Sequence, residues 1–408
     1  MKNIVILLLA GVFAFNSYSQ TPSSYSAIGF GLPNEFKSVR NIGLSSTAST
    51  LDDPDYLNLQ NPAGLTQLEM AKIEAFTTLN GVFSSTTDLK KYYSNGEFGG
   101  FSFSFPISKT YGVGFLAGIT PYTNAKYDLK FQDNSNPAYG STTNEVSLRG
   151  GLSTIFMSSS YIAPYNIKVG LGYKYYFGNT KYSSKVSFGN LSFSDAEYTT
   201  SYEEHGSGFS VGAISPDFQY GVFDKIRFGL TLDGKFTLKS DSMLTRTSTL
   251  VNDTISSGQG DNKIPMKIVA GLSFRFADVY RGLLEYASQD WSSAAGYRVS
   301  ANSGRAYKRI SAGIEYRPVK DAAFDFNKSV FRAGFSYEQL PISVSGTGIN
   351  QITFSTGASF SLSYQNHIDM ALAYGMRGSK ETGQIKESFL RFSLGLSFGE
   401  LWFIQQER

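Results

Sequence analysis

The sequence predicts an all-β protein: an antiparallel transmembrane β-barrel of about fourteen strands, with an N-terminal hatch segment inside the lumen. Three observations lead to this fold class: an export signal, long segments of alternating apolar and polar residues, and connections that alternate between short and long. The composition agrees, since 15% of the residues are aromatic and only 17% are charged. Outer-membrane barrels spread their hydrophobicity over alternate residues in this way.

Residues 1–19 have the layout of a secretory signal peptide. Lys2 precedes an apolar run over residues 4–15, and Ser17 and Ser19 occupy the −3 and −1 positions of a small-residue cleavage site. The apolar run is too short for a membrane anchor, which needs about 20 residues. We therefore expect cleavage near Ser19 and Gln20, and a location in the outer membrane of a Gram-negative cell.

The composition excludes several classes of function. The chain has no Cys, which excludes a lipoprotein anchor, a thiolate metal site and disulfides. A net charge of +3 without a basic cluster gives no indication of nucleic-acid binding. We expect no cofactor and no metal: Asp52, Asp53 and Asp55 lack the Gly and the terminal Glu of a calcium-binding hand and are interpreted as helix caps.

Alternation with a period of two predicts the strands. In residues 167–178, Ile, Val, Leu and aromatic residues alternate with Lys and Gly, and in residues 390–398, Leu and Phe alternate with Arg, Ser and Gly. Successive side chains of a strand point to opposite faces, and a tilted membrane strand needs about 9–11 residues. The predicted strands begin near residues 70, 98, 111, 142, 166, 194, 225, 262, 280, 304, 329, 350, 367 and 384.

The connections between these strands alternate in length. Tight turns are predicted at residues 109–110, 163–165, 277–279 and 365–366, and long polar loops at residues 132–143, 180–198, 241–263 and 288–305. Short periplasmic turns and long outer loops are typical of a membrane barrel, whereas a soluble β-sandwich has no reason to alternate. The chain then divides into a hatch over residues 20–69, a barrel over 70–398 and a periplasmic tail over 399–408.

Residues 48–65 carry a motif that precedes the first strand: an acidic residue, Asp53, followed by Asn61, Pro62, Ala63 and Gly64. This stretch resembles the N-terminal hatch of the FadL-type outer-membrane transporters, which import long-chain fatty acids and aromatic hydrocarbons. The resemblance implies a fourteen-stranded barrel with the hatch in its lumen.

Two further stretches support the resemblance, and two depart from it. Residues 105–114 resemble the second strand, turn and third strand of the family, and residues 284–291 resemble its strand with an acidic-aromatic-Trp ending. Residues 24–31 look more like an uncharacterised subgroup, and residues 399–408 extend past the last strand. Ligand-pocket residues of the family cannot be mapped onto this chain.

The resemblance implies passive uptake of hydrophobic small molecules, fatty-acid-like or aromatic, with lateral exit at a kinked third strand. Gly114, Gly118 and Pro121 are the candidates for this kink, because Gly and Pro within a strand mark bulges and lost ladder bonds. The expected partners are membrane lipids, a hydrophobic ligand and a protein partner in the outer membrane, but no nucleic acid.

Two alternatives stay open. The first is an accessory barrel that docks a secretion-system or surface-protein partner; a plugged lumen with exposed apolar outer loops would favour it, and a continuous apolar cavity would favour transport. The second is an esterase, because Gly208, Ser210 and Gly212 match a nucleophile elbow, with His205 nearby. That motif needs a strand–turn–helix context, so we expect no enzyme.

Overall fold

The computed structural model describes residues 23–27, 30–34, 38–86, 90–134, 140–189, 192–249, 251–293, 304–318, 329–344, 346–363, 366–380 and 384–400. The predicted signal peptide and residues 401–408 of the predicted tail lie outside the described residues. In the ranges above, no helix is both long and apolar enough to cross a membrane.

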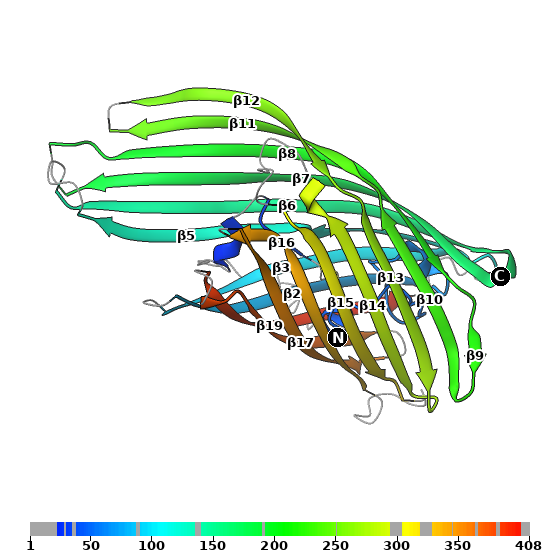
Figure 1. Cartoon of the computed structure of the whole chain (residues 1–408). Coiled ribbons are helices and arrows are strands. Elements are labelled where there is room, and N and C mark those ends of the chain that lie inside the picture. The colour runs from blue at the N-terminus through cyan, green and yellow to red at the C-terminus, as the bar shows by residue number, and fades with distance from the viewer. Residues whose placement is uncertain are drawn as a thin grey trace.

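The wall of the molecule is a closed ring of antiparallel strands (Figure 1). Its strands are β2 (Ala71–Ser85), β3 (Lys90–Ser108), β4 (Val113–Pro121), β5 (Thr123–Asp133), β6 (Thr142–Ala163), β7 (Ile167–Phe188), β8 (Ala196–Ile214), β10 (Phe223–Asp233), β11 (Phe236–Ser248), β12 (Asn252–Ile264), β13 (Lys267–Phe276), β14 (Tyr280–Asp290), β15 (Ala306–Tyr316), β16 (Val330–Val344), β17 (Thr347–Ser361), β18 (His367–Arg377) and β19 (Lys386–Glu400). β19 pairs with β2 from Lys386 to Glu400 and closes the ring.

Three wall strands are interrupted, so that β4 and β5, β10 and β11, and β12 and β13 are halves of single strands. Among the described residues the ring therefore has fourteen strands, and the predicted fold class is confirmed. The short elements η3 (Pro164–Asn166) and β9 (Phe218–Tyr220) lie at the end with the tight turns, which is the periplasmic end of such barrels. η4 (Trp291–Ser293) follows β14 at the opposite, outer end.

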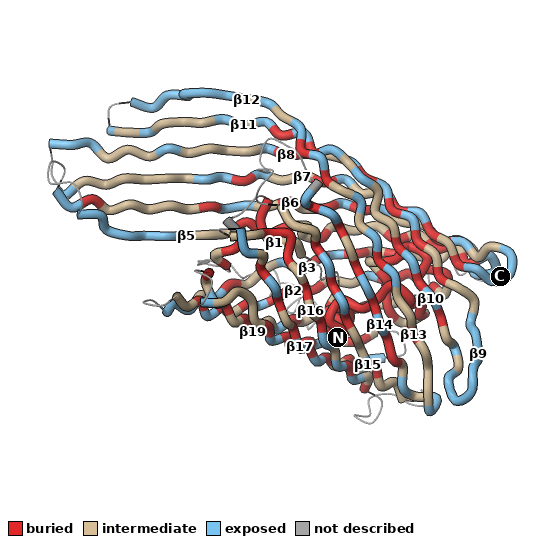
Figure 2. The backbone as a smooth tube through the Cα atoms, viewed as in Figure 1, coloured by how far each residue is buried: buried red, intermediate tan, exposed pale blue. Residues whose placement is uncertain are grey.

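Wall side chains alternate between the lipid and the lumen, and Figure 2 shows this as alternating exposed and buried segments. On β7 the outward Leu171 and Tyr173 are 64% and 39% exposed, whereas the inward Lys168 and Tyr176 are buried. Lipid on one face and a filled lumen on the other account for the period of two in the sequence.

A line of interruptions crosses one side of the wall near its outer end. β4 gives way to β5 at Tyr122, and β12 gives way to β13 at Pro265, which has no N–H for the ladder. On β6, Gly150 and Gly151 lie on the same line with φ angles of 126° and 135°, which favour glycine. Beyond this line the strands bend away from the ring (Figure 1).

We call the part beyond this line the projecting sheet; it consists of residues 123–133, 142–150, 179–188, 196–206, 236–248 and 252–264. The prediction of long loops at residues 180–198 and 241–263 is wrong, because these stretches are mostly strand. Beyond Phe177 the outward residues of β7 are polar, among them Lys181 and Lys185. Without lipid to contact it, this face of β7 is polar.

Candidate functional site: the lumen segment and the interrupted third strand

The described N-terminal residues run from the outer mouth of the ring toward its periplasmic end. At the outer mouth, Ser23 Oγ donates to Glu387 Oε2 at 2.7 Å, and the Tyr25 hydroxyl donates to the Ile385 carbonyl at 2.5 Å. Burial and the neighbouring Glu387 raise the pKa of Tyr25 to about 12. The elements that follow are η1 (Ser24–Ala27), β1 (Leu32–Pro33), α2 (Val39–Gly43) and η2 (Pro62–Leu65). Most residues between 38 and 68, which we call the lumen segment, are buried.

Asp53 is the centre of an ion-pair network between the lumen segment and the wall. It accepts hydrogen bonds from Arg40 at 2.5 Å, from Arg281 at 2.9 Å and from Arg317 at 3.1 Å. Burial alone would raise the pKa of Asp53, but the three guanidinium groups hold it well below its ordinary value. Asp53 therefore stays ionised, which a buried carboxylate does only with such partners.

The network extends along the wall through Glu315 on β15. Glu315 accepts from Arg40 at 2.9 Å and from Arg332 of β16 at 2.8 Å. The ring of Tyr56 lies against this network, 4.5 Å from the Arg40 guanidinium and 4.8 Å from that of Arg332. Its other neighbour is His367 of β18, with ring centroids 4.6 Å apart. The lumen segment is thus held by cation–π contacts as well as by ion pairs.

Two further groups of contacts hold the lumen segment to the wall. Glu285 of β14 accepts the backbone N–H groups of Ala48 and Ser49 at 3.0 and 2.8 Å, and pairs with Arg309 at 2.5 Å. Lys168 of β7 pairs with Asp52 at 2.5 Å. Strands on separate parts of the wall thus bond to the lumen segment.

The interpretation of the acidic residues as helix caps is wrong. Asp52 and Asp53 form the ion pairs described above, and Asp55 lies 3.8 Å from Arg317. The residues that cap helices are Ser38 before α2 and Asn61 before η2. Among the described residues, no group of three His, Cys, Asp or Glu side chains could hold a metal ion.

The Asn-Pro-Ala motif packs η2 against the wall. Asn61 is fully buried: its side-chain carbonyl accepts from the Ala63 N–H at 3.0 Å, and its amide donates to the Ser49 carbonyl at 2.6 Å. Pro62 and Asn61 lie so close to β7 and β8 that a Cβ at Gly170 or Gly212 would overlap them. The motif therefore has a structural role here.

The third wall strand is interrupted one residue after Pro121. β3 pairs with β4 from Phe101 to Ser108, and no described residue of β3 pairs with β5. The ladder between the second and third strands is therefore open on the outer side of Pro121. Gly114 and Gly118 lie inside the paired part. Lateral exit of a solute at this break remains a prediction.

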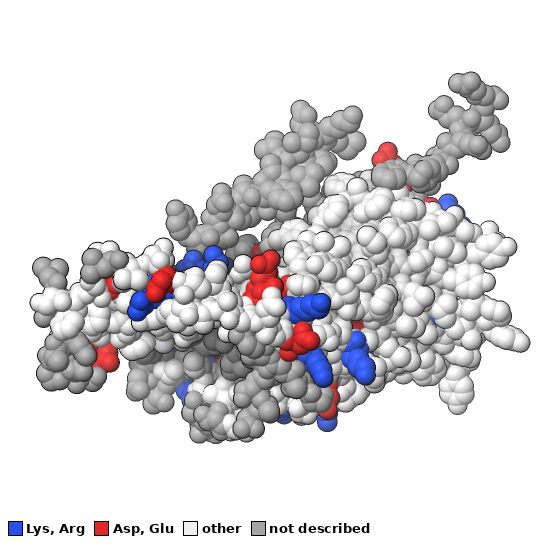
Figure 3. All heavy atoms as spheres, turned by 90° about the horizontal axis from the view of Figure 1, so that it is seen from above, with Lys and Arg blue, Asp and Glu red and all other residues white. Residues whose placement is uncertain are grey.

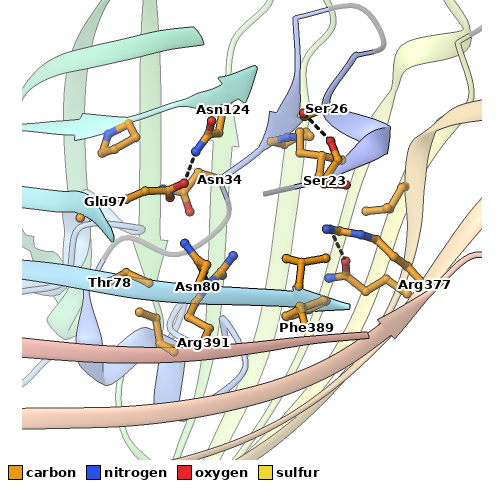
Figure 4. A pocket seen from close by; sticks show the side chains of 18 of the residues that line it. Ser23, Ser26, Asn34, Thr78, Asn80, Glu97, Asn124, Arg377, Phe389 and Arg391 are labelled. Atoms are coloured by element: carbon orange, nitrogen blue, oxygen red, sulfur yellow. Dashed lines mark hydrogen bonds between the residues drawn. The ribbon is translucent and has the colours of Figure 1, made fainter. Parts of the chain in front are cut away.

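A cavity of about 100 Å³ lies in the lumen behind this break (Figure 4). Asn124 donates a hydrogen bond to Glu97 in one part of the lining, and Arg377 and Arg391 lie in another part. Phe389 lies between the two arginines. The lining thus combines polar and apolar side chains, and the volume is below the roughly 300–1,000 Å³ of a usual ligand pocket.

Ser210 does not lie in a nucleophile elbow. It is a buried, inward-facing residue of β8, opposite Gly172 of β7. His205 is on the same strand but an odd number of residues away, so its side chain points to the other face. The Gly-x-Ser-x-Gly match is a consequence of small residues on the lumen face of a strand.

Sequence reasoning missed most residues of the network. Arg40, Glu315 and Arg332 were not predicted as site residues. A charged residue inside an alternating strand does indicate an ion pair in the lumen, because buried charges are almost always paired. The pairing itself could not be predicted, because Arg40 and Glu315 are 275 residues apart.

A family model described as BamG matches residues 1–407. No curated protein matches the sequence. The structure is similar to a FadL homologue from Pseudomonas aeruginosa, with a TM-score of 0.61 and 12% identity over 90% of this chain and 99% of that chain. It is also similar to the toluene transporter TbuX from Ralstonia pickettii (TM-score 0.59, 15% identity, 90% and 98% covered). A third similar structure is the toluene transporter TodX from Pseudomonas putida (TM-score 0.53, 13% identity, 90% and 98% covered). At these identities the similarity shows the fold, an outer-membrane barrel of the FadL type.

Proposed function

The chain belongs to the BamG family, and from this premise we propose that it is an accessory barrel of the outer membrane, which binds a protein partner and keeps its own lumen closed. The observation that carries the proposal is the attachment of the lumen segment. Asp53 and the backbone at Ala48 are bound to β14, and Asp52 is bound to β7, on another part of the ring. Breaking one buried ion pair costs about 3–5 kcal/mol, so a moving hatch would have to overcome several such costs.

Two other features support this proposal. The cavities beside the lumen segment measure about 100 and 60 Å³, which leaves little room for a hydrophobic solute. The projecting sheet extends beyond the apolar belt on the outer side, and transport of a solute through the lumen gives no reason for it. A binding role does, because such a sheet presents backbone edges and a broad face to another molecule.

Native purification followed by mass spectrometry tests the proposal. We expect a stoichiometric protein partner and no bound apolar molecule. In proteoliposomes, the purified barrel should give no flux of toluene or of a fluorescent fatty acid above that of empty vesicles. A bound apolar molecule without a protein partner, or a saturable flux, would contradict the proposal.

A second candidate is passive uptake of small hydrophobic molecules. It is favoured by the open ladder beside Pro121 and by the cavity behind it. Two of the similar structures are described as toluene transporters, and we extend that description to this chain only as a proposal.

Engineered disulfides separate the two candidates, because the chain has no native Cys. Ser45 of the lumen segment and Ser355 of β17 have hydroxyls 2.7 Å apart, so Ser45→Cys with Ser355→Cys would lock the segment to the wall. Thr78 and Ser393, 2.8 Å apart on neighbouring strands, give the matched control that staples only the wall. An accessory barrel should bind its partner equally in both oxidised variants. A conduit whose hatch moves should lose flux only in the first.

A further inference from the structure

We infer that a row of three cations on the projecting sheet, Lys126, Arg149 and Lys181, binds the phosphate groups of the glycolipid in the outer leaflet of the membrane. This inference goes beyond the proposed function, because it adds a lipid-binding site that does not depend on a protein partner.

The three cations lie side by side on the face of the sheet that continues the lipid side of the wall. Register places Arg149 of β6 directly opposite Lys126 of β5 on one side and opposite Lys181 of β7 on the other. Residues paired in this way have Cβ atoms about 4.5–5.5 Å apart, and like charges in such positions destabilise a sheet. The row, which we call the cation row, therefore needs negative charge from its surroundings.

The protein itself supplies little of this negative charge. The Asp128 carboxylate lies 3.5 Å from Arg149, but the two side chains are 34% and 68% exposed, and exposed pairs are weak. Among the described residues, no carboxylate is in ion-pair contact with Lys126 or Lys181. Partial burial lowers the pKa of Lys126, Glu97 partly offsets this effect, and Arg149 adds to it. The pKa of Lys126 stays below its ordinary value, so the nearby carboxylates do not balance the row.

Another row of the same face, farther from the membrane, is balanced. Across β5, β6, β7 and β8 it consists of charges that each stand opposite one of the other sign: Lys130, Glu145, Lys185 and Glu197. Figure 3 shows charged side chains gathered over this part of the molecule, whereas the barrel wall beside them is nearly free of charge. The sheet thus neutralises its charges far from the membrane and leaves cations unneutralised next to it.

The cation row lies just outside the apolar belt of the barrel. Lys181 is on the same face of β7 as Tyr175 and Phe177, because the three are even numbers of residues apart. The rings of Tyr175 and Phe177 are stacked with centroids 6.1 Å apart, and such aromatic residues are typical of the membrane–water interface of a barrel. From Phe177 to Lys181 the strand advances about 13 Å, which is less in height because barrel strands are tilted. Long Lys and Arg side chains reach back over part of this distance, so the row faces the head-group layer.

Charge and position together select the ligand. Guanidinium and ammonium groups bind phosphate through charge-assisted hydrogen bonds, and clusters of Lys and Arg beside a membrane bind anionic head groups. In the outer leaflet of an outer membrane the lipid at this height is lipopolysaccharide, a phosphorylated glycolipid. An acidic peptide has the right charge, but it would have to enter the head-group layer to reach the row.

The test uses the full chain, purified in detergent, freed of native lipid and titrated with lipid A that carries two phosphates; native mass spectrometry counts the bound molecules. Arg149→Gln with Lys181→Gln should weaken this binding about tenfold or more, because two cations are lost. Lys130→Gln with Lys185→Gln is the matched control, since it removes the same charge from the balanced row, and it should weaken binding about threefold or less. Dephosphorylated lipid A should bind wild type at least about tenfold more weakly. Heat-modifiable gel mobility verifies that each variant forms the barrel.

Inorganic phosphate is the second probe, because it separates a lipid site from a site for free phosphate. If it displaces lipid A at an equal concentration, the assignment to a lipid fails. Equal weakening in the two double variants, or equal binding of the two forms of lipid A, would also overturn the inference.

The inference and the proposed function can fail separately. If a co-purifying protein is lost from Arg149→Gln/Lys181→Gln while lipid A binding is unchanged, the row binds that protein; the inference then fails and the proposed function stands. If wild-type protein has no stoichiometric protein partner but binds lipid A through the cation row, the proposed function fails and the inference stands.

Discussion

Replacing Asp53 by Asn should release the lumen segment from the wall. The substitution keeps the size of the side chain and removes one negative charge from the centre of three guanidinium groups. Arg40 is only 6% exposed and cannot reach water, whereas Arg281 and Arg317 are 19% and 23% exposed. Removing one partner of a buried ion pair costs about 3–5 kcal/mol, and the partial hydration of two arginines places the expected loss in the lower half of that range.

Since about 1.4 kcal/mol corresponds to a tenfold change in an equilibrium, the open state of the lumen segment should become more populated by a few hundredfold. Hydrogen–deuterium exchange of peptides from residues 38–69 measures this population directly. Asp253→Asn is the matched control: its pair with Arg246 is 3.0 Å long, but both side chains are more than one-third exposed. That variant should leave exchange of the lumen segment unchanged, because exposed ion pairs contribute little to stability.

If Asp53→Asn shows the same exchange of residues 38–69 as Asp253→Asn, the network does not hold the lumen segment, and the argument for a closed lumen fails. Planar-bilayer recordings give an independent measurement. Wild type and Asp253→Asn should carry no ion current, and Asp53→Asn should show transient current steps as the lumen opens.

Three further predictions follow from the same contacts. The pKa of folded Asp53 is held below its ordinary value of 3.8, so Asp53 contributes its full stabilising free energy above that pH and less as the pH falls below it. Hydrogen–deuterium exchange of the lumen segment, corrected for intrinsic rates, should therefore be constant from pH 7 to pH 5 and rise below about pH 4. Asp53→Asn should abolish this pH dependence. Gly212→Ala should displace Asn61 and destabilise the packing of the lumen segment by about 1–3 kcal/mol, measured as faster exchange of residues 58–66. Gly234→Ala should not have this effect, because its Cβ would lie 3.4 Å from its nearest atom. Oxidised Ser45→Cys/Ser355→Cys should suppress exchange of the lumen segment below the wild-type level, whereas oxidised Thr78→Cys/Ser393→Cys should leave it unchanged.

The sequence predicted the barrel where the membrane imposes its pattern and failed where the membrane ends. Residues 167–178 alternate because one face meets lipid, and the predicted start of this strand is within one residue of the observed Ile167. Residues 241–263 have polar residues on both faces, so their strands β11 and β12 gave no period-two signal. Beyond the membrane, the strands pair because they continue the hydrogen-bonded ladder that begins inside the membrane. A local sequence pattern does not reveal this continuation.

The candidate site was predictable in part for the same reason. Asn61 and Pro62 belong to a local motif, and local turn chemistry can be recognised from neighbouring residues. Arg40, Asp53 and Glu315 meet only because the ring brings β15 next to α2, so the choice of ion-pair partners depends on the completed tertiary structure.

The small residues on the lumen face decide how the interior should be interpreted. In a conduit, glycines facing the lumen would widen the path for a solute. Here a Cβ at Gly170 or Gly212 would overlap Pro62 or Asn61, and one at Gly229 or Gly334 would collide with the backbone of the lumen segment at residues 44–50. These positions on four strands therefore provide room for the chain itself. Since the space at these positions is occupied by the lumen segment, these four glycines favour a barrel built around a fixed interior.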